Sequence, residues 1–357
     1  MSTLYFSMLF FLVLSVVLNK NNSANGDKLY LILCFAIMLL LHSGFNPEYS
    51  DNFLYKRGFI EFQSMSFAEV LTRNAPSLKA ETGYRLLCKV ITLFTSNWTI
   101  AFAIIGFIML SGYYSVVRRY SQFYWLSVLL IMVGPFSQSL FVLRQHLAMG
   151  IILFTYPYII EKKVIPFIIL CVLAISFHQT AAIFLPVYFL YSIRNNKTLF
   201  IVLIIAFIVF FLYFSDFLSV SSSLAMQTAG YGDYYLEYDS ENGTNNKTAL
   251  LLSAILLVRL LIMKNAFFAE GISRLLSITL ILGVIVSISG IGFLGTNRLN
   301  MYFSETAFLL IPNTAQYIKR KDVRTVFGLC FILFYLYYLI KNANSANMSD
   351  FWFFYKH

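Results

Sequence analysis

Long apolar runs separated by short polar segments follow one another along almost the whole chain. A helix that crosses the hydrocarbon core of a bilayer needs roughly 20 residues, and most of these runs approach that length. The chain offers the following twelve candidate transmembrane helices: residues 3–18, 29–45, 97–117, 123–142, 145–160, 164–177, 179–193, 198–215, 249–263, 272–290, 299–317 and 325–340. The runs at 164–177 and 179–193 are short and meet at Phe177-His178-Gln179. They can also form one helical hairpin, which leaves the count open by one or two spans.

The composition supports this interpretation and leaves no material for a soluble domain. Of 357 residues, 59% are hydrophobic and only 12% are charged, and the mean hydropathy is +0.74. Soluble domains carry roughly 25% charged residues. We therefore predict an all-α polytopic membrane protein with about 12 transmembrane helices, forming a single integral membrane domain over residues 1–357. The first run lacks a basic leader and a small-residue cleavage site, so we expect it to be a retained span.

The net charge of +10 does not indicate nucleic-acid binding. The basic residues are scattered singly and in pairs between apolar runs, without a continuous basic face. The four cysteines, Cys34, Cys88, Cys171 and Cys330, lie far apart without metal-binding spacing. We expect no metal site and no cofactor.

The short loops predict the orientation of the chain, because cytoplasmic loops are enriched in lysine and arginine. Six alternate loops carry the following basic residues: Lys20 and Lys28; Arg118 and Arg119; Lys162 and Lys163; Arg194 and Lys197; Lys264 and Arg274; Lys319, Arg320, Lys321 and Arg324. With twelve spans, all six loops lie on the cytoplasmic side and both termini lie outside. The two longest polar segments then also lie outside. Residues 46–96 have the pattern of amphipathic helices lying on the membrane interface, and residues 216–248, rich in glycine, tyrosine and acidic residues, have the pattern of a mobile loop.

Several ionisable residues are not explained by these topology-setting loops. Such a residue in or beside a membrane span is costly and is a functional candidate by default. The candidates that converge on the outer half of the bilayer are Asp51, Glu81, Arg85, Arg144, His178, Arg298 and Glu305. Arg298, Tyr302 and Glu305 are spaced i, i+4, i+7 and should share one helical face. The simpler alternative for each charge is an interfacial anchor or a solvated loop residue.

Arginines gathered at membrane depth suit a phosphate-bearing ligand, because a guanidinium matches phosphate oxygens with paired hydrogen bonds. At this depth the natural ligand is a lipid-linked phosphate or pyrophosphate. A nearby carboxylate could take the proton of an attacking hydroxyl, while the cations stabilise the leaving group. These are the parts of a metal-independent glycosyl transfer from a lipid-pyrophosphate sugar.

At these residues the chain resembles the EpsG-like family of bacterial polysaccharide polymerases, the Wzy-type O-antigen or capsule polymerases. The resemblance rests on an ordered set of segments: NPEYSDNFLYKRGF, ETGYRLL, LRQHLAMGI, ISFHQTAAIFLP and RLNMYF, with Pro312 beyond. It covers most of the chain, and residues 216–248 and the last dozen residues stand outside it.

The resemblance implies a fold similar to GT-C membrane glycosyltransferases and a bacterial cytoplasmic-membrane location with an outward-facing site. It also implies an undecaprenyl-pyrophosphate-linked glycan as donor and a second lipid-linked repeat unit as acceptor, with membrane lipids and a chain-length regulator protein as candidate partners. The residue roles that it implies are as follows: Asp51 or Glu81 as base; Arg144, His178, Arg298 and Arg85 as pyrophosphate ligands; Tyr55, Tyr84, Gln145, Tyr302 and Glu305 as pocket residues. The sequence does not choose between Asp51 and Glu81.

Two alternatives fit the same setting less well. A lipid-linked oligosaccharide flippase should line a path across both leaflets with charges, whereas the unexplained charges here cluster outside. A membrane glycan O-acyltransferase needs a histidine reachable from the cytoplasm, and His178 is predicted on the other side. The sugars, the linkage and the inverting or retaining outcome are left open by the sequence.

Overall fold

The computed structural model describes residues 24–45, 52–193, 198–210, 246–289 and 294–345, together with four residues between 10 and 14. Within these ranges the chain is helical and forms no strand, apart from an isolated bridge between Ala75 and Leu78. The predicted loop at 216–248 lies outside the described residues up to 245, and a helix begins at Asn246. The all-α prediction is confirmed for the part of the chain that the structure describes.

The described residues divide into two compact units. The first unit comprises residues 1–158, 165–182 and 307–357. Its elements are α2 (Ala24–Ser43), α3 (Asn52–Ser64), α4 (Phe67–Thr72), α5 (Thr82–Thr92), α6 (Trp98–Tyr120), α7 (Tyr124–Ile131), the π-helix η1 (Met132–Phe136), α8 (Ser137–Ser139), α9 (Leu143–Leu153), most of α11 (Val164–Phe177), α18 (Ala307–Ala315) and α19 (Lys321–Ser345).

The second unit comprises residues 159–164 and 183–306. Its elements are α12 (Leu185–Ser192), a helix over Thr198–Phe210, α15 (Asn246–Met263), the short η3 (Lys264–Ala266), α16 (Ile272–Ser289) and α17 (Leu294–Ser304). Helix α10 (Tyr156–Ile160) and the 3-10 helix η2 (Gln179–Phe184) lie where the chain passes between the units. In this unit α16 packs against α12, α15 and α17.

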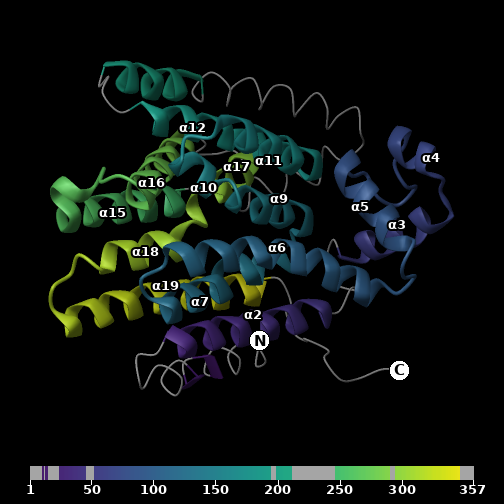
Figure 1. Ribbon diagram of the computed structural model, residues 1–357, viewed down its shortest axis with the longest axis horizontal. Coiled ribbons are helices and arrows are strands. Elements are labelled where there is room, and N and C mark those ends of the chain that lie inside the picture. Colours follow the sequence, from purple (N-terminus) through teal and green to yellow (C-terminus); the bar gives the residue numbers. More distant parts are fainter. Residues whose placement is uncertain are drawn as a thin grey trace. The chain divides into compact units, whose positions relative to one another are not determined.

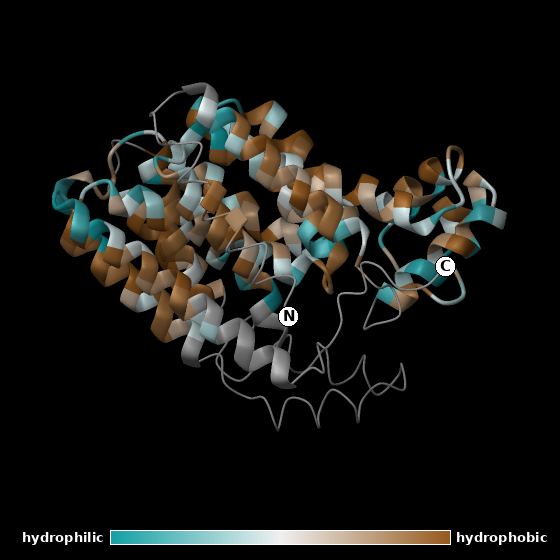
Figure 2. Ribbon diagram, turned by 90° about the horizontal axis from the view of Figure 1, so that it is seen from below, coloured by the Kyte–Doolittle hydropathy of each residue, from teal (hydrophilic) through white to brown (hydrophobic). Residues whose placement is uncertain are grey.

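Among the residues that the structure describes, four helices are long and apolar enough to cross a membrane: Gly26–Ser43, Trp98–Tyr120, Thr248–Ala266 and Ile272–Ser289. Hydrophobic residues occupy most of the long helices (Figure 2), and several large side chains are exposed, such as Phe107, Ile169 and Leu261. Exposed apolar surface on this scale indicates contact with lipid rather than water. The protein is therefore a membrane protein, while the number of twelve spans and the location of the termini stay predictions.

Helix α6 is the central helix of the first unit and contacts both α2 and α9 (Figure 1). At its start the Asn97 side chain accepts a hydrogen bond from the Thr99 amide, which is a standard N-cap. The contact with α9 depends on glycine, because a Cβ placed on Gly150 would lie 2.6 Å from the carbonyl oxygen of Met109. Small residues of this kind let membrane helices approach closely.

Several predicted spans are broken into shorter helices. The run at 123–142 forms α7, then the π-helix η1 containing Pro135, then α8. Proline removes a backbone donor and clashes with the preceding turn, so it disturbs regular α-helical pairing at this point. The run at 299–317 is divided between α17 and α18.

Candidate functional site

Glu81 joins two other predicted site residues of the first unit. Its Oε2 atom forms an ion pair with Nη1 of Arg144. Its Oε1 atom lies 3.0 Å from Nδ1 of His178 and 3.4 Å from the backbone nitrogen of Gln179. The side chains of Glu81, Arg144 and His178 are 14%, 21% and 13% exposed, so they are shielded yet still reachable. We call these three residues, together with Tyr55, the Glu81 cluster.

The local structure around Gly83 brings Glu81 next to His178. Glu81 is the extended residue that precedes α5, and His178 directly follows the last residue of α11. A Cβ on Gly83 would come within 2.6 Å of the carbonyl oxygen of Ser176. Only glycine therefore allows the first turn of α5 to approach the end of α11 this closely.

Arg144 reaches the cluster from the first turn of α9 and is also held by α3. Its Nε donates to the Tyr55 hydroxyl at 3.4 Å, and its guanidinium carbon lies 5.7 Å from the centre of the Tyr55 ring. The Tyr84 ring, which is fully buried on α5, lies 5.7 Å from that of Tyr55. The hydrogen bonds that Arg144 makes to these described residues come from its Nε and Nη1 atoms.

Helix α3 is itself anchored to the turn that precedes α9. The side-chain amide of Asn52, which is fully buried, donates to the carbonyl oxygen of Leu140. Asn52 directly follows the candidate Asp51, but no feature of the sequence pattern distinguishes it. This hydrogen bond fixes the start of α3. Tyr55, one turn further along the helix, is thereby held where its hydroxyl meets Arg144.

The charge state of Glu81 follows from its two partners. Partial burial raises the pKa of a carboxyl group, but here the hydrogen bond from His178 and the charge of Arg144 outweigh burial. Together they lower the pKa of Glu81 to about 2. Glu81 is therefore a carboxylate at neutral pH with both oxygens engaged, which makes it a poor proton acceptor.

His178 has the more suitable atom for accepting a proton. The carboxylate on one side requires Nδ1 to carry a hydrogen, so in the neutral ring Nε2 holds a lone pair. This Nε2 atom is buried and has no hydrogen-bond partner in the described part of the chain. A carboxylate that fixes the tautomer of a histidine and leaves the far nitrogen without a hydrogen-bond partner is the arrangement of a general base.

The remaining predicted residues of the first unit lie in different surroundings. Arg85 is buried, and its guanidinium donates to the carbonyl oxygen of Leu71, the Thr82 hydroxyl and the Asn74 side chain. These partners do not belong to the Glu81 cluster, and they tie α5 to the end of α4. Gln145 is fully buried in α9. Asp51 lies outside the described residues.

Three further candidates belong to the second unit. Arg298 is exposed on α17, while Tyr302 and Glu305 are buried. Glu305 follows the last helical residue, and its amide still bonds to the carbonyl oxygen of Met301. Arg298 and Tyr302 thus lie on α17, and Glu305 is the first residue after that helix. The predicted i, i+4, i+7 spacing is therefore present in the structure. Their roles in ligand binding stay predictions.

No group of three histidine, cysteine, aspartate or glutamate side chains suited to a metal ion occurs among the residues that the structure describes. The Glu81 cluster places an arginine beside a carboxylate–histidine pair. Chemically it can bind a phosphate oxygen on the guanidinium of Arg144 and accept a proton on Nε2 of His178.

Comparison with known proteins identifies one family. The model of the EpsG family matches residues 29–357, which is most of the chain and includes the whole Glu81 cluster. No curated protein and no solved structure matches the chain.

Proposed function

The chain belongs to the EpsG family, and from this membership we propose that it is a polysaccharide polymerase of the bacterial cytoplasmic membrane. The proposed donor is a glycan linked to undecaprenyl pyrophosphate, and the proposed acceptor is a second lipid-linked repeat unit. The site would open to the outer face of that membrane. Family membership supports a polymerase-like role, and the apolar helices support the membrane setting.

In the proposed reaction a hydroxyl of the acceptor sugar attacks the anomeric carbon of the donor. A new carbon–oxygen bond forms as the bond between that carbon and the pyrophosphate oxygen breaks. The growing glycan moves to the acceptor, the hydroxyl loses its proton, and undecaprenyl pyrophosphate leaves with the bonding electron pair. The chemistry therefore needs one group to accept a proton and another to neutralise the leaving pyrophosphate.

The observation that carries the proposal is that one carboxylate, Glu81, holds both an arginine and a histidine. We assign proton acceptance to Nε2 of His178 and pyrophosphate binding to Arg144. Glu81 would fix the histidine tautomer and stabilise the imidazolium that forms, so it acts as a positioning residue. Tyr55 would hold the guanidinium plane through its hydroxyl and ring.

The test is replacement of Arg144 by alanine in cells that produce the polymer. Losing an arginine contact made to a developing charge costs about 10²–10³-fold in rate, so we expect long-chain glycan to disappear while the protein is still inserted at its normal level. Arg73→Ala is the matched control, because Arg73 is an exposed arginine of the same unit and is paired with Glu69. Such a surface pair contributes little.

Normal chain lengths in the Arg144→Ala variant would contradict the site assignment. Loss of polymer in both variants, or loss of the Arg144→Ala protein from the membrane, would point to a structural defect. Measuring polymer formation from purified lipid-linked repeat units with each protein separates these outcomes from effects on the cell.

A further inference from the structure

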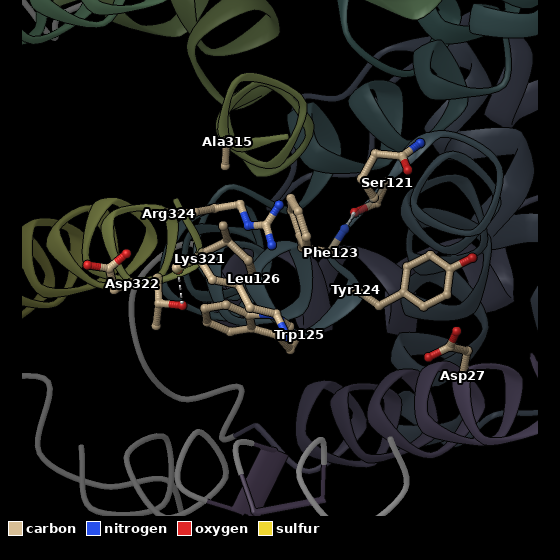
Figure 3. A pocket seen from close by; sticks show the side chains of 12 residues that line it. Asp27, Ser121, Phe123, Tyr124, Trp125, Leu126, Ala315, Lys321, Asp322 and Arg324 are labelled. Carbon is tan, nitrogen blue, oxygen red and sulfur yellow. Dashed lines mark hydrogen bonds between the residues drawn. The ribbon is translucent and has the colours of Figure 1, made fainter. Parts of the chain in front are cut away.

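A second candidate site lies in the first unit, at the end of α6 away from the Glu81 cluster. Helices α2, α7 and α19 begin at this end, and α6 finishes there. They enclose a pocket of about 780 Å³, shown in Figure 3. We call it the α19 pocket, and its walls include Asp27, Phe123, Tyr124, Trp125, Lys321 and Arg324.

The α19 pocket is well separated from the proposed catalytic residues. Helix α6 has 23 residues, which correspond to about 34 Å at 1.5 Å per residue. The Phe59 ring on α3 lies 5.7 Å from that of Trp98, the first residue of α6, so the Glu81 cluster is near the start of α6. The α19 pocket begins at Ser121, after its last residue. The pocket therefore lies at the height of the opposite set of lipid headgroups.

One wall of the α19 pocket is cationic. The guanidinium carbon of Arg324 lies 4.9 Å from the centre of the Phe123 ring, and Lys321 lies one turn earlier on α19. Lys321 and Arg324 are spaced i, i+3 and so are neighbours on the helix surface. The nearby Asp322 pairs with Arg320 at 2.6 Å, whereas Arg324 makes no ion pair among the described residues. The ring fixes the guanidinium without satisfying its hydrogen-bond donors.

The other wall carries a carboxylate. Asp27, in the first turn of α2, lies beside the Tyr124 ring, across the pocket from Arg324 and Lys321 (Figure 3). The pocket thus presents Arg324 and Lys321 on one side, together with Asp322, whose carboxylate is paired with Arg320; Asp27 lies on the other side, with aromatic rings between. A ligand that matches this distribution carries a phosphate group and an amine joined by a short apolar spacer.

We propose that the α19 pocket binds a phosphoethanolamine group, with its phosphate on Arg324 and Lys321 and its ammonium on Asp27. The depth of the pocket favours the headgroup of a membrane phospholipid as the source. Phosphatidylcholine would bind less well, because its methylated ammonium has no hydrogen to donate to Asp27. This inference goes beyond the proposed polymerase and does not depend on it.

The test measures lipid retention rather than polymer formation. The full chain is reconstituted in nanodiscs of phosphatidylcholine with minor, equal fractions of phosphatidylethanolamine and phosphatidylglycerol, and is then transferred to detergent. Mass spectrometry of the retained lipid should show phosphatidylethanolamine enriched about tenfold over the bulk ratio, a preference worth about 1.4 kcal/mol. The enrichment should be lost in Arg324→Gln and in Asp27→Asn.

Arg320→Gln is the matched control, because Arg320 carries the same charge at the same helix start but is 76% exposed and paired with Asp322. It should retain the lipid as the wild type does. Equal retention in Arg324→Gln and Arg320→Gln, or no enrichment in the wild type, would overturn the proposal. Preferential retention of phosphatidylglycerol would overturn the role of Asp27. Thermal unfolding of each variant excludes general misfolding as the cause.

A second experiment distinguishes two sources of the phosphoethanolamine group, a membrane lipid and a free phosphate ester. Soluble phosphoethanolamine is titrated into the protein that has retained lipid. If the headgroup of a membrane lipid is the ligand, the soluble compound should displace the lipid only at high concentration. Binding of the soluble compound to the wild type without any lipid enrichment would show that the source is a free phosphate ester, and would overturn the lipid assignment.

Discussion

Replacing Glu81 by glutamine tests the electrostatic basis of the candidate site. The substitution keeps the shape of the side chain and removes only its charge, so Arg144 and His178 lose their common partner. Lowering the pKa of a carboxyl from 4.5 to about 2 corresponds to about 3 kcal/mol of preference for its charged form. Allowing for partial screening by solvent, we expect Glu81→Gln to lower the free energy of unfolding by about 2 kcal/mol at pH 7.

The pH dependence of this difference follows from the direction in which the pKa moves. A carboxyl whose pKa is lowered in the folded state contributes its full stability above its ordinary pKa, and loses it as the pH falls through the lowered value. The wild type and Glu81→Gln should therefore differ fully at pH 7, differ less below about 4.5, and converge near pH 2.

The assay is thermal unfolding of both purified proteins in one detergent over this pH range. Glu69→Gln is the control, because Glu69 also pairs with an arginine and is exposed, and glutamine can complete the same capping box at the start of α4. A difference between wild type and Glu81→Gln that stays constant from pH 7 to pH 3, or its absence at pH 7, would refute the electrostatic argument.

Two further predictions concern catalysis and packing. His178→Ala should reduce polymer formation from purified substrates by about 10²–10⁴-fold, and added imidazole should restore part of the rate if Nε2 is the base; a loss that imidazole does not relieve would favour a purely structural role. Gly112→Ala should lower the thermal stability by about 1–3 kcal/mol, because its Cβ would collide with the backbone of Gly150 across the α6–α9 contact. The control Gly328→Ala, whose Cβ meets side-chain atoms of Leu126 and Trp125, should be milder, and equal effects would contradict the packing argument.

The position of the helices was largely predictable from hydropathy. The apolar run expected at 97–117 corresponds to α6 at Trp98–Tyr120, and the run at 272–290 corresponds to α16 at Ile272–Ser289. The breaks were not predictable in the same way, because hydropathy records how apolar a segment is and not whether its backbone pairing continues. The π-helix around Pro135 is one example.

The members of the candidate site were predictable from the sequence, but their pairing was not. The positions of Glu81, Arg144 and His178 beside apolar runs made all three candidates, and their common depth in the membrane stays a prediction. Their contacts join residues 63 and 97 positions apart, and a single sequence holds no record of such distant partners. The same reasoning grouped Arg85 with them, whereas its hydrogen bonds go to the α4–α5 connection. Charge type and depth do not distinguish a ligand-binding arginine from one that holds a loop.

The two oxygens of Glu81 connect the anion-binding and proton-accepting sides of the proposed site. A pyrophosphate carries more negative charge than a carboxylate and therefore competes with Glu81 for Arg144. Glu81 would keep its contact with His178 and stabilise the imidazolium formed when the acceptor hydroxyl is deprotonated. Under this mechanism Glu81→Gln, which frees Arg144 from its internal partner, should bind the lipid pyrophosphate donor more tightly and yet turn it over more slowly. Weaker donor binding together with slower turnover would show instead that Glu81 positions Arg144, and the division of roles between its two oxygens would be wrong.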